Sequence, residues 1–157
     1  MAPGVNRNPS DMAPERRREA MGLLAKATRS ELEQAWTGLA SRPEAELVRG
    51  PEAGLVMVRG RIGGGGAPFN LGETTVSRAS IRLDDGTVGH GQALGTDGAK
   101  ARLAAIFDAL FQQPGHKAAG ETLLDAVMAR VAKEDAEKAR QTAATRVDFF
   151  TMVRGED

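Results

Sequence analysis

The alternation of apolar and polar positions separates a central segment with strand character from flanking segments with helical character. Side chains in a strand point to alternate faces, whereas a helix repeats its apolar face every three or four residues. Between residues 54 and 94 the period is two, in three runs: residues 55–62, 75–83 and 87–94. We also expect a short strand at 45–49, broken by Gly50-Pro51, and a glycine-rich loop at 63–73 that interrupts the sheet. The pattern therefore predicts an antiparallel β-meander over about residues 45–94.

The second and third runs are joined by Asp84-Asp85-Gly86-Thr87, a sequence typical of a tight hairpin turn. A two-residue loop of Asp85 and Gly86 sets the predicted register. Leu83 then lies opposite Val88, and Ile81 lies opposite His90 on an apolar face. The reverse face pairs arginines and serine with very small residues: Arg82 with Gly89, Ser80 with Gly91, and Arg78 with Ala93.

Helical periodicity predicts four helices around this sheet. The first begins between Asp11 and Pro14 and runs to about Ala27, and the second opens with a capping box at residues 30–33 and stops at Pro43. The third is capped by Thr96 or Asp97 and has the strongest amphipathic pattern, so we expect it to cover the apolar face of the sheet. The fourth begins at about Glu121. The predicted fold class is α+β, with an N-terminal helical hairpin, the meander packed against C-terminal helices, and an extended C-terminal tail.

Composition narrows the possible functions. The 157 residues suit a single domain over residues 13–157, after a disordered N-terminus at 1–12. The net charge is zero, which argues against a general polyanion binder. The chain has no cysteine, no tyrosine and only two histidines, which removes thiolate metal ligands and a cysteine nucleophile. These absences favour a subunit or binding module, with no metal site. The lack of a transmembrane run or signal-peptide core predicts a cytoplasmic protein.

The C-terminal segment 145–155 is rich in large apolar and arginine side chains. Phe149 and Phe150 point in opposite directions in an extended chain, so one sheet face cannot bury both. Composition leaves two alternatives open: the tail folds back on its own domain, or it docks on another chain. The partner-binding hypothesis names Arg146, Val147, Asp148, Phe149, Phe150, Met152 and Arg154.

The same tail, Arg146-Val-Asp-Phe-Phe-Thr-Met-Val-Arg-Gly155, resembles the C-terminal signature of the PhnG family, the G subunit of the bacterial carbon–phosphorus lyase system. Other blocks agree in order and spacing: residues 19–25, 52–55, 61–66, 69–73, 77–79 and 85–89. The resemblance covers roughly residues 15–155.

The resemblance implies a role that the residue chemistry does not supply. It implies an accessory subunit, not catalytic alone, that acts with subunits H, I and L to transfer the ribose 5-triphosphate moiety of ATP to a phosphonate, with release of adenine. It also implies a core complex with subunits H, I and J, in which the iron–sulfur cluster and S-adenosylmethionine belong to another subunit. No catalytic residue and no cofactor is assigned to this chain.

Two further hypotheses come from the residues. Arginine binds phosphate oxygens in a bidentate manner, so a phosphate site is possible at Arg59, Arg61, Gly63, Gly64, Arg78 and Arg82. The glycine loop lacks the Gly-Lys-Ser/Thr of a P-loop, and ordinary solvent-facing or partner-facing arginines are the favoured alternative. The alternative function from another class is a stand-alone phosphoryl-ligand-binding or regulatory module.

Overall fold

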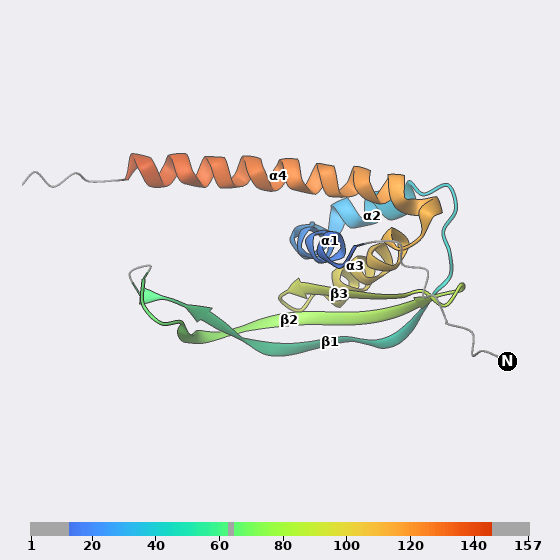
Figure 1. Cartoon of the computed structure of the whole chain (residues 1–157), viewed down its shortest axis with the longest axis horizontal. Coiled ribbons are helices and arrows are strands. Elements are labelled where there is room, and N and C mark those ends of the chain that lie inside the picture. The colour runs from blue at the N-terminus through green and yellow to red at the C-terminus, as the bar shows by residue number, and fades with distance from the viewer. Residues whose placement is uncertain (1–12, 63–64, 146–157) are drawn as a thin grey trace, which may run out of the picture.

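The computed structural model describes residues 13–62 and 65–145 and has the predicted α+β class (Figure 1). The elements follow one another in this order: α1 (Pro14–Lys26), α2 (Arg29–Thr37), β1 (Ala45–Gly60), β2 (Phe69–Leu83), β3 (Val88–Leu94), α3 (Gly98–Phe111), the short 3-10 helix η2 (Pro114–His116) and α4 (Lys117–Ala144). No helix in these ranges is long and apolar enough to cross a membrane.

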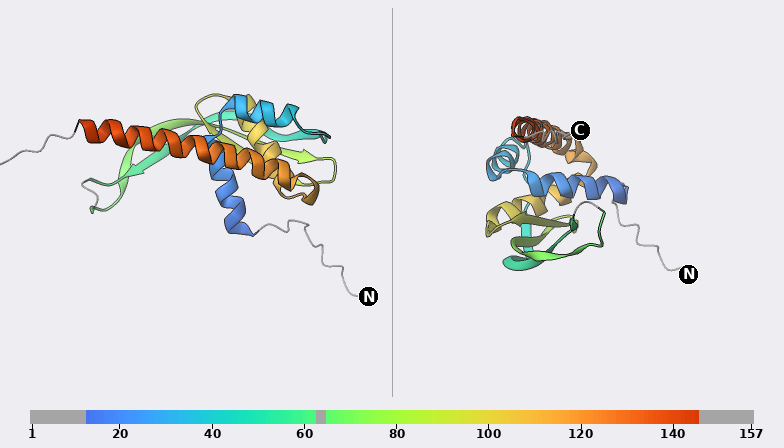
Figure 2. Two further views of the ribbon diagram at one scale, coloured as in Figure 1. Left: turned by 90° about the horizontal axis from the view of Figure 1, so that it is seen from above. Right: turned by 90° about the vertical axis from the view of Figure 1, so that its left-hand side faces the viewer.

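The elements form three layers (Figures 1 and 2). The antiparallel sheet, in the order β1-β2-β3, is the first layer. Helix α3 packs on one face of the sheet, and α1 lies beside it against β3. The long helix α4 is the outer layer: it contacts α1, α2 and α3 but not the sheet. The N-terminal helices pack on α3 and α4 rather than on each other.

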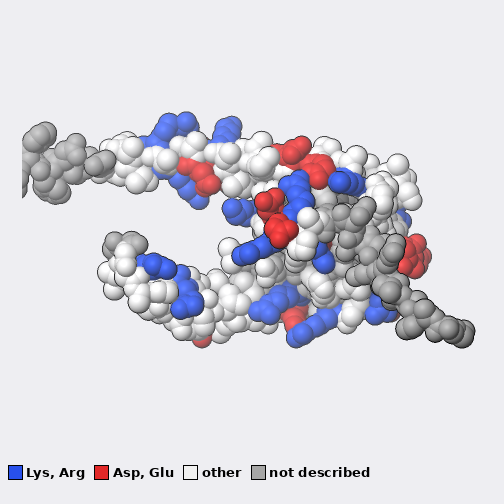
Figure 3. All heavy atoms as spheres, in the orientation of Figure 1, with Lys and Arg blue, Asp and Glu red and all other residues white. Residues whose placement is uncertain are grey.

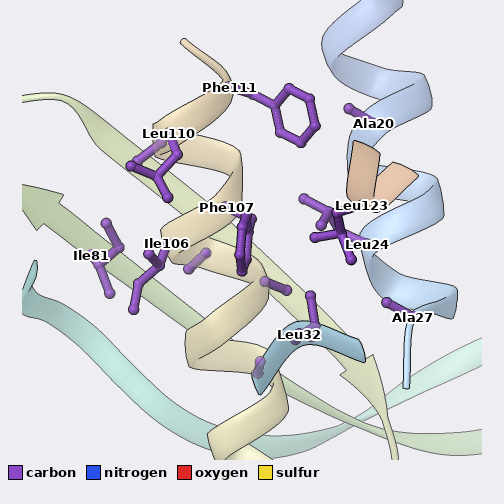
Figure 4. Packing of buried hydrophobic residues seen from close by; sticks show 14 of the residues in the cluster. Ala20, Leu24, Ala27, Leu32, Ile81, Ile106, Phe107, Leu110, Phe111 and Leu123 are labelled. Atoms are coloured by element: carbon purple, nitrogen blue, oxygen red, sulfur yellow. The ribbon is translucent and has the colours of Figure 1, made fainter. Parts of the chain in front are cut away.

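The core lies around α3, which covers the sheet as predicted but is also buried on its other side, against α1 and α4. Ile106 and Leu110 point toward Ile81 of the sheet, while Phe107 and Phe111 point toward α1 and α4 (Figure 4). The buried cluster also contains Leu24 from α1, Leu32 from α2, and Leu123, Leu124 and Val127 from α4. Burial of a large apolar side chain contributes about 1.5–3 kcal/mol, so α3 is the element that holds the layers together.

The turn between β2 and β3 corrects the predicted register. The loop holds three residues, Asp84 to Gly86, because Leu83 N–H donates to the Thr87 carbonyl at 2.9 Å, and Gly86 has a φ of +88°. This is the geometry of a type I turn closed by a glycine in the left-handed region. The pairing therefore shifts by one residue, and a shift of one moves every partner to the other face.

The corrected register places the small residues of β3 under α3. Ile81 lies opposite Gly89, and Ala79 lies opposite Gly91. A Cβ on Gly91 would overlap the Ala101 carbonyl oxygen and the Ala105 nitrogen of α3. The glycines thus allow helix α3 to touch the sheet backbone, and they do not face the arginines. Arg78, Ser80 and Arg82 instead pair with Gln92, His90 and Val88.

Three predicted boundaries were also wrong. Helix α2 is capped by Thr28 with Glu31, not by Ser30, because the Thr28 hydroxyl accepts from Glu31 N–H at 3.2 Å while the Glu31 carboxylate accepts from Thr28 N–H at 2.7 Å. That helix ends at Thr37, before Pro43, and α4 begins at Lys117, before Glu121. Of the two predicted caps of α3, Thr96 and Asp97, the structure has Asp97, whose carboxylate accepts from Lys100 N–H.

Strand β1 is continuous where a break was predicted. It runs through the cis Gly50–Pro51 bond, with irregular pairing to β2 between Leu47 and Glu52. The predicted loop at 63–73 is shorter, because β2 begins at Phe69 and Phe69 already pairs with Gly60. The result is a β1–β2 hairpin much longer than β3.

Candidate functional site

Two arms extend beyond the packed body toward the same side of the molecule (Figures 1 and 2). The ribbon arm is the distal β1–β2 hairpin, residues 54–60 paired with 69–76. The helix arm is the C-terminal part of α4, residues 132–144. Val127 is the last fully buried residue of α4 and Val131 is half-buried, and every residue of the helix arm is exposed.

The ribbon arm carries much of the exposed apolar surface of the described chain. The exposed fraction is 63% for Leu55 and 52% for Met57, and the same arm exposes Val58, Phe69 and Leu71. A two-stranded ribbon is only marginally stable in water, and a continuous exposed apolar patch marks an interaction site. Leu55, Met57 and Val58 are therefore exposed on a formed strand and are not part of the core.

The register shows which way these side chains face. Leu55 lies opposite Thr75, and Met57 lies opposite Glu73. Thr75 shares its parity with Ala79 and Ile81 of the same strand, and those residues face α3. Leu55 and Met57 are therefore on the helix side of the sheet, directed at the space between the two arms. Strand β1 is also an edge strand, since only β2 pairs with it in the described sheet.

The space between the arms is an open hollow (Figure 3). The helices that separate the sheet from α4 in the body do not extend into it (Figure 1). On the helix-arm side, Lys138 lies seven residues after Val131, which is two helical turns, so both residues are on the face of α4 that points to the sheet. The floor of the hollow on the ribbon thus carries the exposed Leu55 and Met57 beside Glu73, and its roof on α4 is polar.

Two ion pairs tie the layers of the body together. Asp108 of α3 is 1% exposed and accepts two hydrogen bonds from the Arg17 guanidinium, at 3.0 and 2.7 Å. Its second oxygen also accepts from the His90 backbone N–H at 2.8 Å. One carboxylate therefore ties α1, α3 and β3 together, which makes it a structural group.

A second pair fixes α4. The Arg130 guanidinium donates to both carboxylate oxygens of Glu31, at 2.7 and 3.1 Å, and to the Lys26 carbonyl. These hydrogen bonds are the main cause of a lowered pKa for Glu31. Arg130 also donates to Glu134 at the start of the helix arm. The direction in which the helix arm projects is thereby set by α1 and α2.

The residues of the phosphate hypothesis do not gather at one point. Arg78 and Arg82 are exposed and lie on the sheet face opposite α3. Arg59 is seven residues beyond Glu52, the residue that pairs with Arg78, so it lies about 23 Å farther along the ribbon. Arg61 is exposed just after β1, and Gly63 and Gly64 lie outside the described residues. Phosphate binding by Arg78 and Arg82 stays a prediction.

His90 occupies another position than expected. His90 was predicted to lie on the apolar face opposite Ile81, but it is exposed and pairs with Ser80, whose hydroxyl is 2.9 Å from His90 Nδ1. His116 is half-buried in η2. In residues 13–62 and 65–145, no group of three His, Cys, Asp or Glu side chains could hold a metal ion.

The predicted docking tail, Arg146 to Arg154, lies outside the described residues. The ribbon arm is the surface that the sequence reasoning missed. Its signal was present in Leu55-Val-Met-Val58, where both faces of the strand are apolar. Such a strand needs cover on both sides, and the described part of this chain leaves Leu55, Met57 and Val58 exposed.

Comparisons with known proteins now identify the family. Residues 15–155 match the family model described as phosphonate metabolism protein PhnG. The chain is also similar to the alpha-D-ribose 1-methylphosphonate 5-triphosphate synthase subunit PhnG of Rhizobium meliloti (strain 1021). The two are 67% identical over 141 residues, which is 90% of each chain.

Proposed function

The chain belongs to the PhnG family of phosphonate metabolism proteins, and on that premise we propose that it is a subunit of an alpha-D-ribose 1-methylphosphonate 5-triphosphate synthase. The single observation that carries this proposal is the 67% identity to a protein of that name over nine-tenths of both chains. A subunit implies partner subunits, and the two arms offer surface for them.

Within this proposal the chain contributes shape and contacts, and the bond-making residues belong to its partners. We propose subunits H, I and J as its partners in a core complex, with subunit L acting alongside them. The assembly would transfer the ribose 5-triphosphate moiety of ATP to a phosphonate and release adenine. The iron–sulfur cluster and S-adenosylmethionine would be held by another subunit, and the assembly would be cytoplasmic. The exposed apolar ribbon arm supports a contact role.

The proposal is tested by leaving this chain out. The cognate subunits H, I and L, co-expressed with this chain, should convert ATP and methylphosphonate to adenine and the ribose 1-phosphonate 5-triphosphate product. The same preparation without this chain should form no product above background, and adding the purified chain should restore it. Product formation at an equal rate without the chain would contradict the proposal. Adenine release by the purified chain alone would contradict its accessory role.

The tail hypothesis gives a separate prediction. A chain that ends at Ala144 should keep its circular dichroism spectrum and melting temperature, because the described core is built from residues 20–131. Recovery of partner subunits in a pull-down should fall tenfold or more, since buried aromatic and arginine anchors at interfaces cost about 2 kcal/mol or more each when removed.

The matched variant for this test keeps the full length and changes Phe149 and Phe150 to alanine. It should lose most of the same recovery if the aromatic side chains are the anchors. Normal assembly of the truncated chain would show that the tail is not the docking element.

A further inference from the structure

The helices of the middle layer, α1 and α3, do not extend as far as the sheet and α4, which form the outer layers. In the body, α1 and α3 separate the sheet from α4, and their side chains fill that space. Beyond the body the sheet continues as the ribbon arm and α4 continues as the helix arm, with the hollow between them (Figures 1 and 3). The two walls of the hollow therefore continue surfaces that elsewhere enclose a layer of helices.

We infer that a helical segment of another synthase subunit occupies this hollow and completes the middle layer. The inference rests on the proposed function, because it requires a partner subunit. It adds the place where that partner binds and the kind of segment that binds there.

The walls specify the chemistry of the bound helix. Leu55 and Met57 on the floor are 63% and 52% exposed, so the helix must present an apolar stripe toward the ribbon arm. Lys138 on the roof and Arg59 near the end of the ribbon are exposed, and no ion pair among the described residues includes either one. Carboxylates on the sides of the helix that face Lys138 and Arg59 would complement these cations.

A second copy of this chain offers no suitable helix among its described residues. The apolar stripes of α1, α2 and α3 are already buried in the core of their own chain. The helix arm is exposed, but residues 132–144 contain only alanine and polar side chains, with no large apolar residue to place on Leu55 and Met57. The described helices of a second copy therefore do not suit the hollow, and the proposed occupant is a segment of a different subunit.

The absence of native cysteine makes the hollow directly testable. The introduced thiol of a Met57→Cys variant should react with a maleimide at least tenfold more slowly in the assembled complex than in the isolated chain. The matched control is Val48→Cys, which lies on the same strand outside the ribbon arm with a similar exposed fraction, 48% against 52%. The reaction rate of the control should change less than twofold. Equal reactivity of the Met57→Cys thiol in both states would overturn the inference.

A photoreactive maleimide attached to the same introduced thiol identifies the occupant. The expected cross-linked peptide comes from another subunit and has an apolar stripe flanked by acidic residues. A peptide of this chain, or a segment without helical apolar spacing, would overturn the inference. If the unmodified chain does not assemble at all, the proposed function fails, and the inference about the hollow fails with it. If the Met57→Cys variant assembles but its thiol still reacts freely, only the inference about the hollow fails, and the proposed function stands.

A charge substitution gives an independent measurement. Met57→Glu should lower the melting temperature of the isolated chain by no more than a few degrees, because the side chain is already half-exposed and the main added cost is repulsion from the exposed Glu73 opposite it. Partner recovery in a pull-down should fall tenfold or more, because a carboxylate would be placed against the apolar stripe of the bound helix. Val48→Glu is the control and should assemble normally. Normal recovery with Met57→Glu would contradict the inference.

Discussion

Replacement of Asp108 by alanine should lower the free energy of unfolding by about 3 kcal/mol and the melting temperature by about 10 °C. The change removes a carboxylate that is 1% exposed and accepts from both the Arg17 guanidinium and the His90 N–H. Arg17 then loses its counter-charge, and the His90 N–H loses its acceptor. The expected cost is near the lower end of the range for a broken buried pair, because the Arg17 side chain is 30% exposed and can turn to water. Thermal and urea unfolding followed by circular dichroism measure it.

The matched control breaks an exposed ion pair made by the neighbouring arginine of α1. Glu121→Ala removes the partner of Arg16, and these side chains are 33% and 43% exposed. Water replaces such a contact at little cost, so the loss should not exceed about 1 kcal/mol. If both variants lost the same stability, burial of Asp108 would not explain its contribution.

Gly91→Ala is the second change with a large expected effect, about 3 kcal/mol of lost stability. Gly91 faces α3, where an added Cβ would overlap the Ala101 carbonyl oxygen and the Ala105 nitrogen. Backbone atoms of a packed helix cannot turn aside as a flexible side chain can. Helix α3 must therefore move away from the sheet, and contacts of Ile106 and Leu110 with Ile81 weaken (Figure 4). Denaturant unfolding of the isolated chain measures the effect.

Gly72→Ala is the control in the same sheet. Gly72 lies in the ribbon arm, and no heavy atom would lie within 4 Å of an added Cβ. The free energy of unfolding of the Gly72→Ala variant should change by less than about 0.5 kcal/mol, as for other exposed substitutions. A large loss in Gly72→Ala, or none in Gly91→Ala, would show that the close approach of α3 does not limit the fold.

The β2–β3 hairpin shows how a turn predicted at the correct residues can still assign side chains to the wrong face of the sheet. The turn was placed at the right residues, but a three-residue loop was taken for a two-residue loop. The sequence pattern did not separate these loops, because Asp-Gly suits both. That single residue decided whether Gly89 and Gly91 lie beneath α3 or opposite the polar residues Arg82 and Ser80. The close contact of helix and sheet settled it, since only glycine fits there.

The ribbon arm shows the other limit of sequence reasoning. Alternation predicted the strand at residues 55–62, and the structure contains the strand through Gly60. Burial depends on which helices reach that part of the sheet, and α3 does not extend over the arm (Figure 1). The same apolar pattern therefore describes a core strand and an exposed docking surface. Nothing in the periodicity distinguishes Met57, which is exposed, from Ile81, which is buried.

By itself, the sequence determined what depends on neighbouring residues along the chain: the α+β class, the helix α3 with a cap at Thr96 or Asp97, the turn at Asp85-Gly86, and the family. Tertiary structure alone decided what depends on contacts between distant segments. It paired Arg17 with Asp108 across 91 residues, placed the glycines of β3 under α3, and left the two arms projecting with a hollow between them. The physical reason is that backbone propensity and side-chain periodicity act over a few residues, whereas burial is fixed only when the layers meet.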